Sequence, residues 1–159
     1  MKMAGGVEWG LHCCVVLSGV DDPVPAAKLA QFHDVSPTYL AKQLQALSRA
    51  GLVHSTQGQA GGYRLTRPPT EITVLDVVEA IGGAEPAFRC TEVRQRGPLA
   101  APPETCTAPC GIARVMHTAD RAWRDALARV SIADLAADLG RTAGADTLPR
   151  VRQWLRTGE

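Results

Sequence analysis

The chain has 159 residues and a net charge of +1, and 45% of its residues are hydrophobic while only 4% are aromatic. This length suits one domain, or a small domain with a dimerisation element, and an aliphatic, alanine-rich composition favours helices. A charge near zero does not by itself indicate a nucleic-acid partner, and the lack of an 18-residue apolar run excludes a helical membrane span.

Five cysteines are the other notable feature of the composition. The N-terminal region carries no recognisable secretory signal, so we expect a cytoplasmic protein with reduced thiols. In such a protein, cysteines bind metals, carry redox chemistry or fill the core rather than form a disulfide framework. Cys13 and Cys14 lie in an apolar stretch and are expected to be small core residues.

Three helices are predicted in the first third of the chain. Apolar residues at helical spacing predict a helix over 7–18, and a short second helix is expected over 25–32. Ser36 can cap a third helix and Pro37 suits its first position, so this helix is expected to run to about Arg49. Two short helices followed by a capped third one are typical of a helix-turn-helix.

A β-hairpin is expected directly after these helices. Strand patterns at 52–56 and 63–66 flank a glycine-rich connection. Thr73 then caps a helix over 74–81. Residues 1–82 are therefore predicted to form a winged helix-turn-helix DNA-binding domain, and the fold class is mostly α with a small β-hairpin wing.

The second half of the chain has a different character. Residues 83–110 are rich in proline and glycine, and a loop of this length is usually functional or disordered. Residues 111–139 are expected to form the dimerisation helix, which runs from Gly111 to about Arg129 and continues over 132–139 behind a cap at Ser131. Residues 140–159 are expected to be a C-terminal tail with a short helix around 151–155. One face of the long helix carries apolar residues at alternating steps of four and three, which suits packing on another helix. The residues of this face are Ile112, Met116, Ala119, Trp123, Ala126 and Val130.

The segment from Ser36 to Thr70 contains no Asp or Glu, although it contains four Lys and Arg residues. A stretch of one sign in a near-neutral protein indicates a surface for DNA phosphates, and the start of a recognition helix reaches base edges in the major groove. The alternative is a winged helix used only for protein contacts. The residues expected to contact DNA are Ser36, Thr38, Tyr39, Lys42, Gln43 and Arg49 on the third helix, and Gly61, Gly62 and Arg64 in the wing.

Two groups of residues have the chemistry of metal ligands. Glu8 and His12 lie one turn apart on the first predicted helix, so both can reach one metal ion, although such a pair is also common on protein surfaces. Cys90 begins the long loop and Cys110 ends it, at the start of a helix whose free N–H groups favour a thiolate. Cys106 lies four residues before Cys110.

The motifs of the predicted DNA-binding unit resemble those of a known family. The stretches SPTYL at 36–40, AGLV at 50–53 and GGYRL at 61–65 are similar to those of the iron–sulfur winged-helix transcriptional regulators that include IscR and NsrR. Within that family the chain is most similar to the RsrR-type redox regulators. The resemblance covers residues 1 to about 135, and it implies a homodimer that holds an iron–sulfur cluster between the DNA-binding unit and the cysteine-bearing loop.

The resemblance also implies a ligand set. A [2Fe–2S] cluster takes two protein ligands on each iron, and Cys90 with Cys110 and Glu8 with His12 would supply them in the manner of the RsrR-type members. The Glu–His pair is expected to come from the other subunit. Cys106 is the reserve ligand, and the alternatives are a different cluster that uses Cys106, zinc, or no metal.

The predicted function is a homodimeric transcriptional regulator that binds a double-stranded DNA operator and senses redox state through the cluster. Trp9, which follows Glu8, is a candidate for the switch that transmits the change. Alternatives are a regulator that senses nitric oxide or iron–sulfur status, and a zinc-stabilised adaptor. No nucleophile elbow, P-loop or Rossmann motif indicates an enzyme, and no small-molecule substrate is expected. His33, His54 and His117 are interpreted as surface or satisfied residues.

Overall fold

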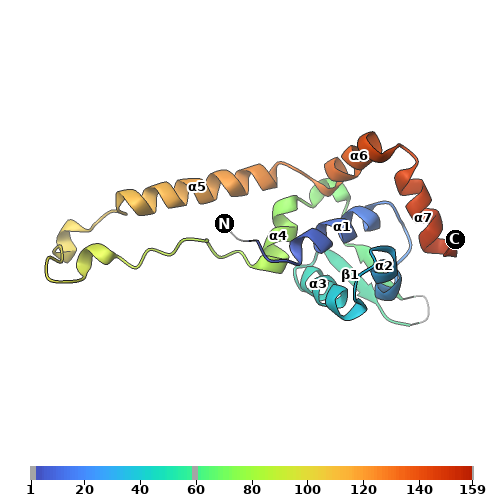
Figure 1. The fold of residues 1–159 in the computed structure, drawn as a ribbon, viewed down its shortest axis with the longest axis horizontal. Helices are drawn as coiled ribbons and strands as arrows, with labels where there is room; N and C mark the ends of the chain where they lie inside the picture. The colour runs from blue at the N-terminus through green and yellow to red at the C-terminus, as the bar shows by residue number, and fades with distance from the viewer. Residues whose placement is uncertain (1–2, 59–60, 159) are drawn as a thin grey trace. The chain divides into compact units, whose positions relative to one another are not determined.

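The computed structural model describes residues 3–58 and 61–158, which form mostly helices and one two-stranded hairpin, as predicted (Figure 1). The helices are α1 (Val7–Ser18), α2 (Ala26–Phe32), α3 (Pro37–Arg49), α4 (Val74–Gly82), α5 (Gly111–Ala128), α6 (Ile132–Ala143) and α7 (Thr147–Thr157). The strands are β1 (Val53–Thr56) and β2 (Gly62–Leu65), and the 3₁₀ turns are η1 (Pro69–Glu71), η2 (Val93–Gln95) and η3 (Pro103–Thr105). In the part of the chain that the structure describes, no helix is long and apolar enough to span a lipid bilayer.

The described residues divide into two units. Residues 3–84 and 127–158 form what we call the core unit, and residues 85–126 form what we call the cysteine unit. The hydrophobic core lies in the core unit, where α1 and α3 bury their apolar faces against each other and against α4 and the hairpin.

The core confirms the sequence interpretation of the first cysteine pair. The side chains of Cys13 and Cys14 have no exposed surface, and they pack among the leucines of α1 and α3. Burial raises the pKa of the Cys13 thiol to about 12 and that of the Cys14 thiol further still. Both thiols therefore stay protonated and serve as small apolar side chains.

The helix-turn-helix follows the predicted boundaries. The turn between α2 and α3 places Asp34 at a φ of 50°, and the amide of Val35 donates to the carbonyl of Ala30 at 3.0 Å. Ser36 occupies the N-cap position of α3, but its side chain makes no capping hydrogen bond, contrary to the prediction. Pro37 at the first position already supplies the helical φ and lacks an N–H that needs a partner.

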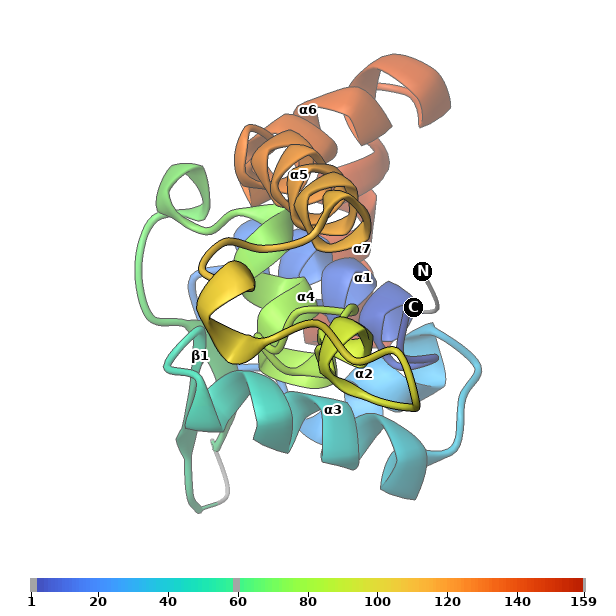
Figure 2. The ribbon, with the colours of Figure 1, turned by 90° about the vertical axis from the view of Figure 1, so that its left-hand side faces the viewer.

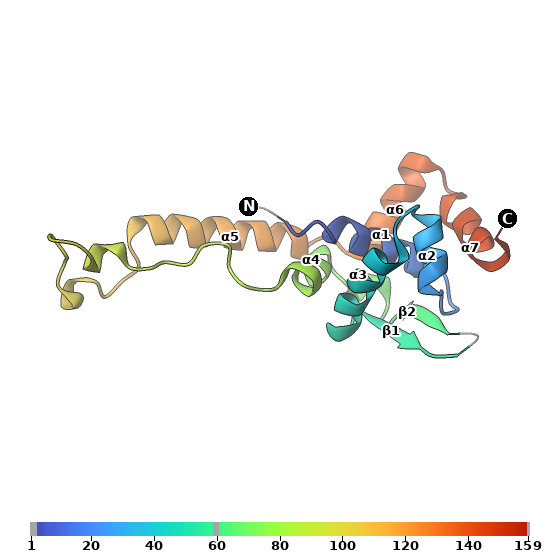
Figure 3. The ribbon, with the colours of Figure 1, turned by 60° about the horizontal axis from the view of Figure 1, so that its bottom comes forward.

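The wing is the antiparallel hairpin β1–β2, with each strand starting and ending within one residue of its predicted bounds. Figure 3 shows this hairpin beside α3. Val24 and Tyr63 exchange backbone hydrogen bonds of 2.8 and 2.9 Å, which attaches β2 to the start of α2. Gly62 lies so close to the Val24 backbone that a side-chain carbon there would collide with it. The hairpin is therefore tied to the helix-turn-helix at a position that only glycine can occupy without a shift.

Capping boxes start two of the later helices. Thr73 accepts a hydrogen bond from the Asp76 amide at 3.1 Å and donates its own amide to the Asp76 carboxylate at 2.8 Å, so the predicted cap of α4 is confirmed. Ser131 and Asp134 make the same arrangement at the start of α6.

The dimerisation element predicted over 111–139 forms two helices, which meet where the sequence places a cap at Ser131. α5 ends at Ala128, and the backbone of the next residues pairs with the segment before α4: the Val74 amide donates to Val130 and the Ile132 amide donates to Ile72, at 2.9 and 2.8 Å. These backbone bonds end the helix because the N–H and C=O groups of this stretch are used by another segment. α6 therefore belongs to the core unit, and Ile132 is fully buried there.

The C-terminal tail over 140–159 is more helical than expected, and the short helix predicted around 151–155 lies within the longer α7. α6 continues through Gly140 to Ala143, and α7 packs on α1 and α2 with Leu155 only 7% exposed. Pro149, which suggested a loop, lies in the first turn of α7, where its missing N–H breaks no helical bond. The apolar face of α7 is short, so its burial depends on a groove that the sequence pattern does not reveal.

Candidate DNA-binding and metal-ligating sites

The predicted DNA-reading helix, α3, lies along one edge of the core unit (Figure 2). Tyr39 is 40% exposed although it is a large aromatic residue, and its neighbours on this face are equally accessible. The exposed members of the predicted set around α3 are Ser36, Thr38, Tyr39, Lys42 and Arg49. Neutral hydrogen-bonding groups at the start of the helix and basic groups further along it are the arrangement that a major-groove reader needs.

Gln43 does not belong to this exposed face. It is only 5% exposed, and a side-chain carbon at Gly6 would collide with its amide group. The reason is helical periodicity, because Gln43 lies three residues after Leu40 and next to Leu44, on the buried side. The structure therefore corrects the prediction that Gln43 is presented to DNA and makes it a packing residue between α3 and the start of α1.

The predicted wing residues divide in a similar way. Arg64 is exposed, and it lies opposite His54 in the register of the hairpin. Gly62 is buried against the Val24 backbone, and a side chain at Gly61 would meet backbone atoms of the hairpin connection. The two glycines thus allow backbone segments to lie close together. Arg64 presents its charge to solvent, and the exposed His54 adds a polar group that was not in the predicted DNA-contact set.

Glu8 and His12 are both exposed on α1, one turn apart, as predicted. Both line an open hollow of about 320 Å³ whose other walls are four apolar residues of α1 and α6 together with Asp138 and Thr142. Its lining residues are Glu8, Leu11, His12, Val15, Leu135, Asp138, Leu139 and Thr142. Across residues 3–58 and 61–158, no three His, Cys, Asp or Glu side chains of the single chain come together as a group that could hold a metal ion.

His33 was interpreted as a surface or satisfied residue, and the structure corrects this. Its ring lies 5.8 Å from the ring of His12 and 6.1 Å from that of Trp9, and its buried Nε2 has no hydrogen-bond partner among the described residues. Burial lowers the pKa of His33, and the nearby His12 lowers it further. His33 is the C-cap residue of α2, so only the packing of α2 against α1 brings the two imidazoles together.

Trp9 joins the same cluster. Its ring is half-buried and lies 6.5 Å from the ring of His12. Through His33 and Phe32 the cluster continues into α2, the first helix of the helix-turn-helix, because the rings of Phe32 and His33 are 4.9 Å apart. The predicted switch residue therefore contacts one candidate metal ligand and the residue that ends α2.

In the cysteine unit, Cys90 and Cys110 line one hollow of about 580 Å³. Phe88, Val93 and Ile112 contribute apolar walls to it, and Cys106 is not among its lining residues. The Sγ atom of Cys106 instead lies 4.0 Å from the hydroxyl of Thr105. The ligand roles of Cys90 and Cys110, and the reserve role of Cys106, stay predictions.

Cys110 immediately precedes α5, where the amide of Ala113 donates to its Sγ atom at 3.4 Å. This is the arrangement expected from the sequence, since free N–H groups at a helix start stabilise a thiolate. Cys90, by contrast, is exposed.

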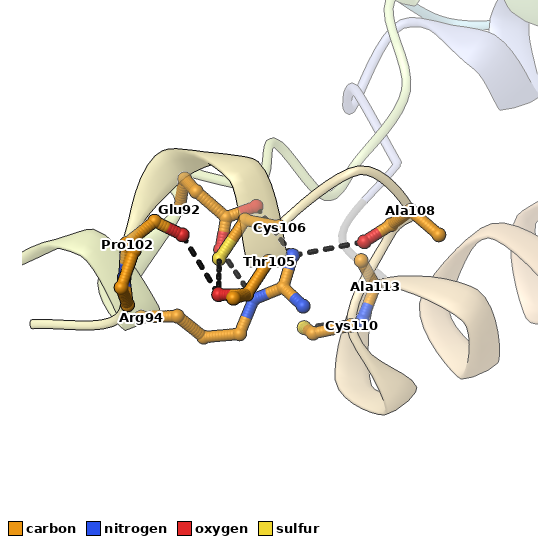
Figure 4. Close-up of polar contacts among 8 residues, drawn as sticks. All are labelled: Glu92, Arg94, Pro102, Thr105, Cys106, Ala108, Cys110 and Ala113. Carbon is orange, nitrogen blue, oxygen red and sulfur yellow. Dashed lines mark hydrogen bonds and ion pairs between the residues drawn. The ribbon is translucent and has the colours of Figure 1, made fainter.

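An arginine that sequence reasoning did not single out organises the same loop (Figure 4). Arg94 donates to both carboxylate oxygens of Glu92, from Nε at 2.6 Å and from Nη2 at 2.8 Å, and Nη2 also donates to the carbonyl of Ala108 at 2.9 Å. The bond to Glu92 raises the pKa of the guanidinium most, and the charges of Cys106 and Cys110 raise it further. The sequence does not reveal the role of Arg94, because its partners lie in an irregular segment whose residues follow no helical or strand period.

α5 carries the predicted apolar face, and much of it is unpartnered within the described chain. Ile112 is 71% exposed, Val115 68% and Met116 40%. Large aliphatic side chains exposed in a row on one helix are uncommon on a monomer and mark an interaction surface.

A protein-family model named Rrf2, described as an iron-dependent transcriptional regulator, matches residues 3–138. Protein aau3 of Rhizobium meliloti (strain 1021) is 36% identical over 108 residues, which are 68% of this chain and 66% of that protein. The HTH-type transcriptional regulator IscR of Aliivibrio salmonicida (strain LFI1238) is 38% identical over 76 residues, which are 48% of this chain and 45% of that protein. The matches thus span about half to two thirds of these relatives' own length.

Solved structures share the fold. CymR (YrzC), the global cysteine regulator of B. subtilis, superposes with a TM-score of 0.67 at 23% identity, over 86% of this chain and 97% of CymR. IscR of T. potens superposes with a TM-score of 0.63 at 22% identity, over 87% of this chain and 88% of that IscR. These likenesses confirm the predicted winged helix-turn-helix architecture.

Proposed function

The chain belongs to the Rrf2 family of transcriptional regulators, and on that premise we propose that it is a homodimeric DNA-binding regulator that senses redox state through a [2Fe–2S] cluster. Regulation of transcription through DNA follows from the family. The matched family model and the matched IscR are both described as transcriptional regulators, in agreement with the sequence prediction. The cluster, the dimer and the redox signal are the parts that need argument and test.

One observation carries the cluster proposal: the four expected ligands form two pairs that each share a surface. Cys90 and Cys110 line one hollow, and Glu8 and His12 line another. Two thiolates suit one iron, and a nitrogen donor on the other iron raises the potential, as His ligands do in Rieske centres. A bound [2Fe–2S] cluster would take up and release one electron. The donor set therefore fits a redox-active cluster better than a structural zinc site, which favours four Cys or His ligands.

The surroundings of the pairs support the same assignment. The Ala113 amide and the Arg94 guanidinium are both arranged to stabilise negative charge at Cys110. Glu8 and His12 are exposed, so a ligand or a partner chain can reach them. Cys106 remains the reserve ligand.

A dimer through α5 would bring the pairs together. The exposed Ile112, Val115 and Met116 need an apolar partner surface, and the hollow beside Glu8 and His12 has walls of Leu11, Val15, Leu135 and Leu139. A second copy of the chain satisfies both surfaces. We therefore propose that Glu8 and His12 of one protomer and the two cysteines of its partner form one site.

The route from the cluster to DNA would run through Trp9 and His33. Both contact His12, and His33 ends α2, which packs on the DNA-reading helix α3. A change in charge at His12 would alter the packing of these rings and so the position of α2 against α3. Oxidised and reduced crystals in which Trp9 and His33 keep the same positions would exclude this route.

The experiment is anaerobic purification with iron and acid-labile sulfide counts and a visible absorption spectrum. Wild type is expected to be coloured and to contain both elements. Cys90→Ala and Cys110→Ala are expected to lose the colour, while the matched control Cys106→Ala, from the same loop, retains it. Operator binding, measured by fluorescence anisotropy on the oxidised and dithionite-reduced forms, is expected to differ at least tenfold.

Other outcomes select the alternatives. Loss of colour in Cys106→Ala with retention in Cys110→Ala would favour a different cluster type, as in a sensor of nitric oxide or iron–sulfur status. A colourless protein that contains zinc would favour the adaptor. Wild-type protein in which neither iron nor sulfide can be reconstituted would overturn the cluster proposal and leave DNA binding standing.

A further inference from the structure

One side chain joins the two chain segments that carry the cysteines of the hollow. We call the segment after Cys90 the Cys90 arm and the segment before Cys110 the Cys110 arm. Glu92 lies two residues after Cys90, and Ala108 lies two residues before Cys110; the guanidinium of Arg94 bonds to both. The backbone carbonyl of Arg94 also accepts a hydrogen bond of 2.7 Å from the amide of Ala101 in the middle of the loop. A single arginine thus connects the Cys90 arm, the middle of the loop and the Cys110 arm.

The backbone of Glu92, the partner of Arg94, adopts an uncommon conformation. Its φ of 49° and ψ of 57° lie in the left-handed region, which is unfavourable for a residue with a branched or long side chain. Such a backbone persists when surrounding contacts hold it. The two-pronged bond from Arg94 holds the Glu92 carboxylate, and the Gln95 amide donates to the Glu92 carbonyl at 3.0 Å. The pair is about one-third exposed on each side, at 34% for both side chains.

The charge of Arg94 also faces the thiols. In Figure 4 the guanidinium lies between the side chains of Cys106 and Cys110. The other arginine of the hollow, Arg89, pairs with Glu85 at 2.6 Å in a well-exposed ion pair. Arg94 is therefore the fixed cation of this loop.

We propose that Arg94 is the positioning residue of the cysteine site: it holds the Cys90 and Cys110 arms at a set separation, and it places a positive charge beside the thiols that raises the reduction potential of the cluster. This inference rests on the proposed function. Reduction adds one negative charge, and a nearby fixed cation stabilises that charge more than it stabilises the oxidised state.

The positioning part is tested on the protein without its cluster. Amide hydrogen exchange over residues 92–108 is expected to become at least tenfold faster in Arg94→Gln. It is also expected to become faster in Arg94→Lys, because lysine cannot make the two-pronged bond. The control is Arg96→Gln, which removes the same charge from an exposed arginine two residues further on and is expected to exchange like wild type. Equal exchange in Arg94→Gln and Arg96→Gln would overturn positioning.

The charge part is tested by redox titration of the cluster absorbance under anaerobic conditions. Arg94→Gln is expected to lower the reduced-to-oxidised ratio at least tenfold at a fixed solution potential, about 59 mV for one electron. Glu92→Gln removes the compensating negative charge and is expected to shift the ratio the other way, which decides the point if Arg94→Gln cannot hold a cluster. Potentials of Glu92→Gln and Arg94→Gln equal to that of Arg96→Gln would overturn the charge role.

These experiments distinguish a failure of the proposed role of Arg94 from a failure of the proposed cluster. If wild-type protein contains no iron or sulfide, the cluster proposal fails while the exchange result still reports on positioning. If wild type holds a cluster and these variants behave like the control, only the role of Arg94 fails.

Discussion

Some residues of the winged helix are exposed where DNA could be contacted, and others are buried in the packing of the domain. Residues that are neighbours in the sequence can differ in this respect. Lys42 is exposed on α3, whereas Gln43, the next residue, is buried against the start of α1. Arg64 presents its charge from the wing, whereas Gly62 two residues earlier is held against the Val24 backbone. A DNA-contact set is therefore chosen by exposure as well as by residue type.

Lys42 and Arg64 are the best-placed basic residues for a test of DNA binding. Replacing either with Gln is expected to weaken binding to a duplex selected from a random pool by about 1–3 kcal/mol if the residue touches a base. A phosphate contact would instead lower affinity evenly across sequences and reduce the salt dependence by about one ion. Fluorescence anisotropy at several salt concentrations distinguishes the two cases.

The control for this prediction is Arg141→Gln, which removes an exposed arginine on α6 that pairs with Asp138 at 2.8 Å. It is expected to leave affinity unchanged. Wild-type affinity in both Lys42→Gln and Arg64→Gln would contradict the assignment of α3 and the wing to DNA.

At the scale of elements, the junction between α5 and α6 decides where the long helix ends. The Ser131 hydroxyl accepts the Asp134 amide at 3.1 Å, and the Asp134 carboxylate accepts the Ser131 amide and hydroxyl at 2.8 and 2.7 Å. These bonds start a new helix at Ile132 and leave α5 to end four residues earlier. The cap and the backbone pairing with the segment before α4 thus reinforce each other.

Replacing Ser131 with Ala is expected to lower the free energy of unfolding by about 0.5–2 kcal/mol at pH 7, the usual effect of losing an N-cap. The hydrogen bond from the Ser131 side chain, followed by that from its amide, lowers the pKa of Asp134 below its ordinary value of 3.8. A carboxylate with a lowered pKa contributes stability that is complete above 3.8 and is lost as the pH falls through the folded-state pKa.

The difference between wild type and Ser131→Ala is therefore expected to be largest at neutral pH and to shrink below pH 3.8. Urea midpoints at several pH values measure it. The control is Thr142→Ala on the same helix, because the Thr142 hydroxyl donates to backbone carbonyls of that helix, those of Asp138 at 2.9 Å and Leu139 at 3.5 Å, and to no carboxylate of the described residues. A difference that is constant with pH would show that the carboxylate takes no part.

At the scale of the whole molecule, the unpartnered face of α5 calls for a second chain. Glutamate in place of Val115 and Met116 together, neither of which lines the cysteine hollow, is expected to convert the proposed dimer to a monomer, because it puts charge on an apolar contact. Operator affinity should then fall at least tenfold, since the two half-sites of an operator are bound by two linked units. Sedimentation velocity and anisotropy measure the two effects.

Arg114→Gln, on the opposite side of α5, is the control and is expected to remain dimeric. Loss of cluster content together with the dimer would support ligands from both subunits. A dimer that survives the double substitution would move the interface elsewhere.

What the sequence by itself determined is local. Helical spacing predicted α1 and α3 and the shared face of Glu8 and His12, glycine and strand patterns predicted the wing, and capping residues predicted the start of α4. These features depend on neighbours within a few residues along the chain, so a pattern of residues is enough to reveal them.

The tertiary structure alone decided which distant residues meet. It buried Gln43, brought His33 to His12, seated α7 on α2, and joined the cysteine loop through Arg94. Each of these contacts joins two segments that are separated by a loop or by another helix or strand. The sequence of a loop has no regular period, so it does not predict which residues the two segments bring together. Burial and hydrogen-bond partners at these positions are set by the packing of whole elements, which only the folded chain defines.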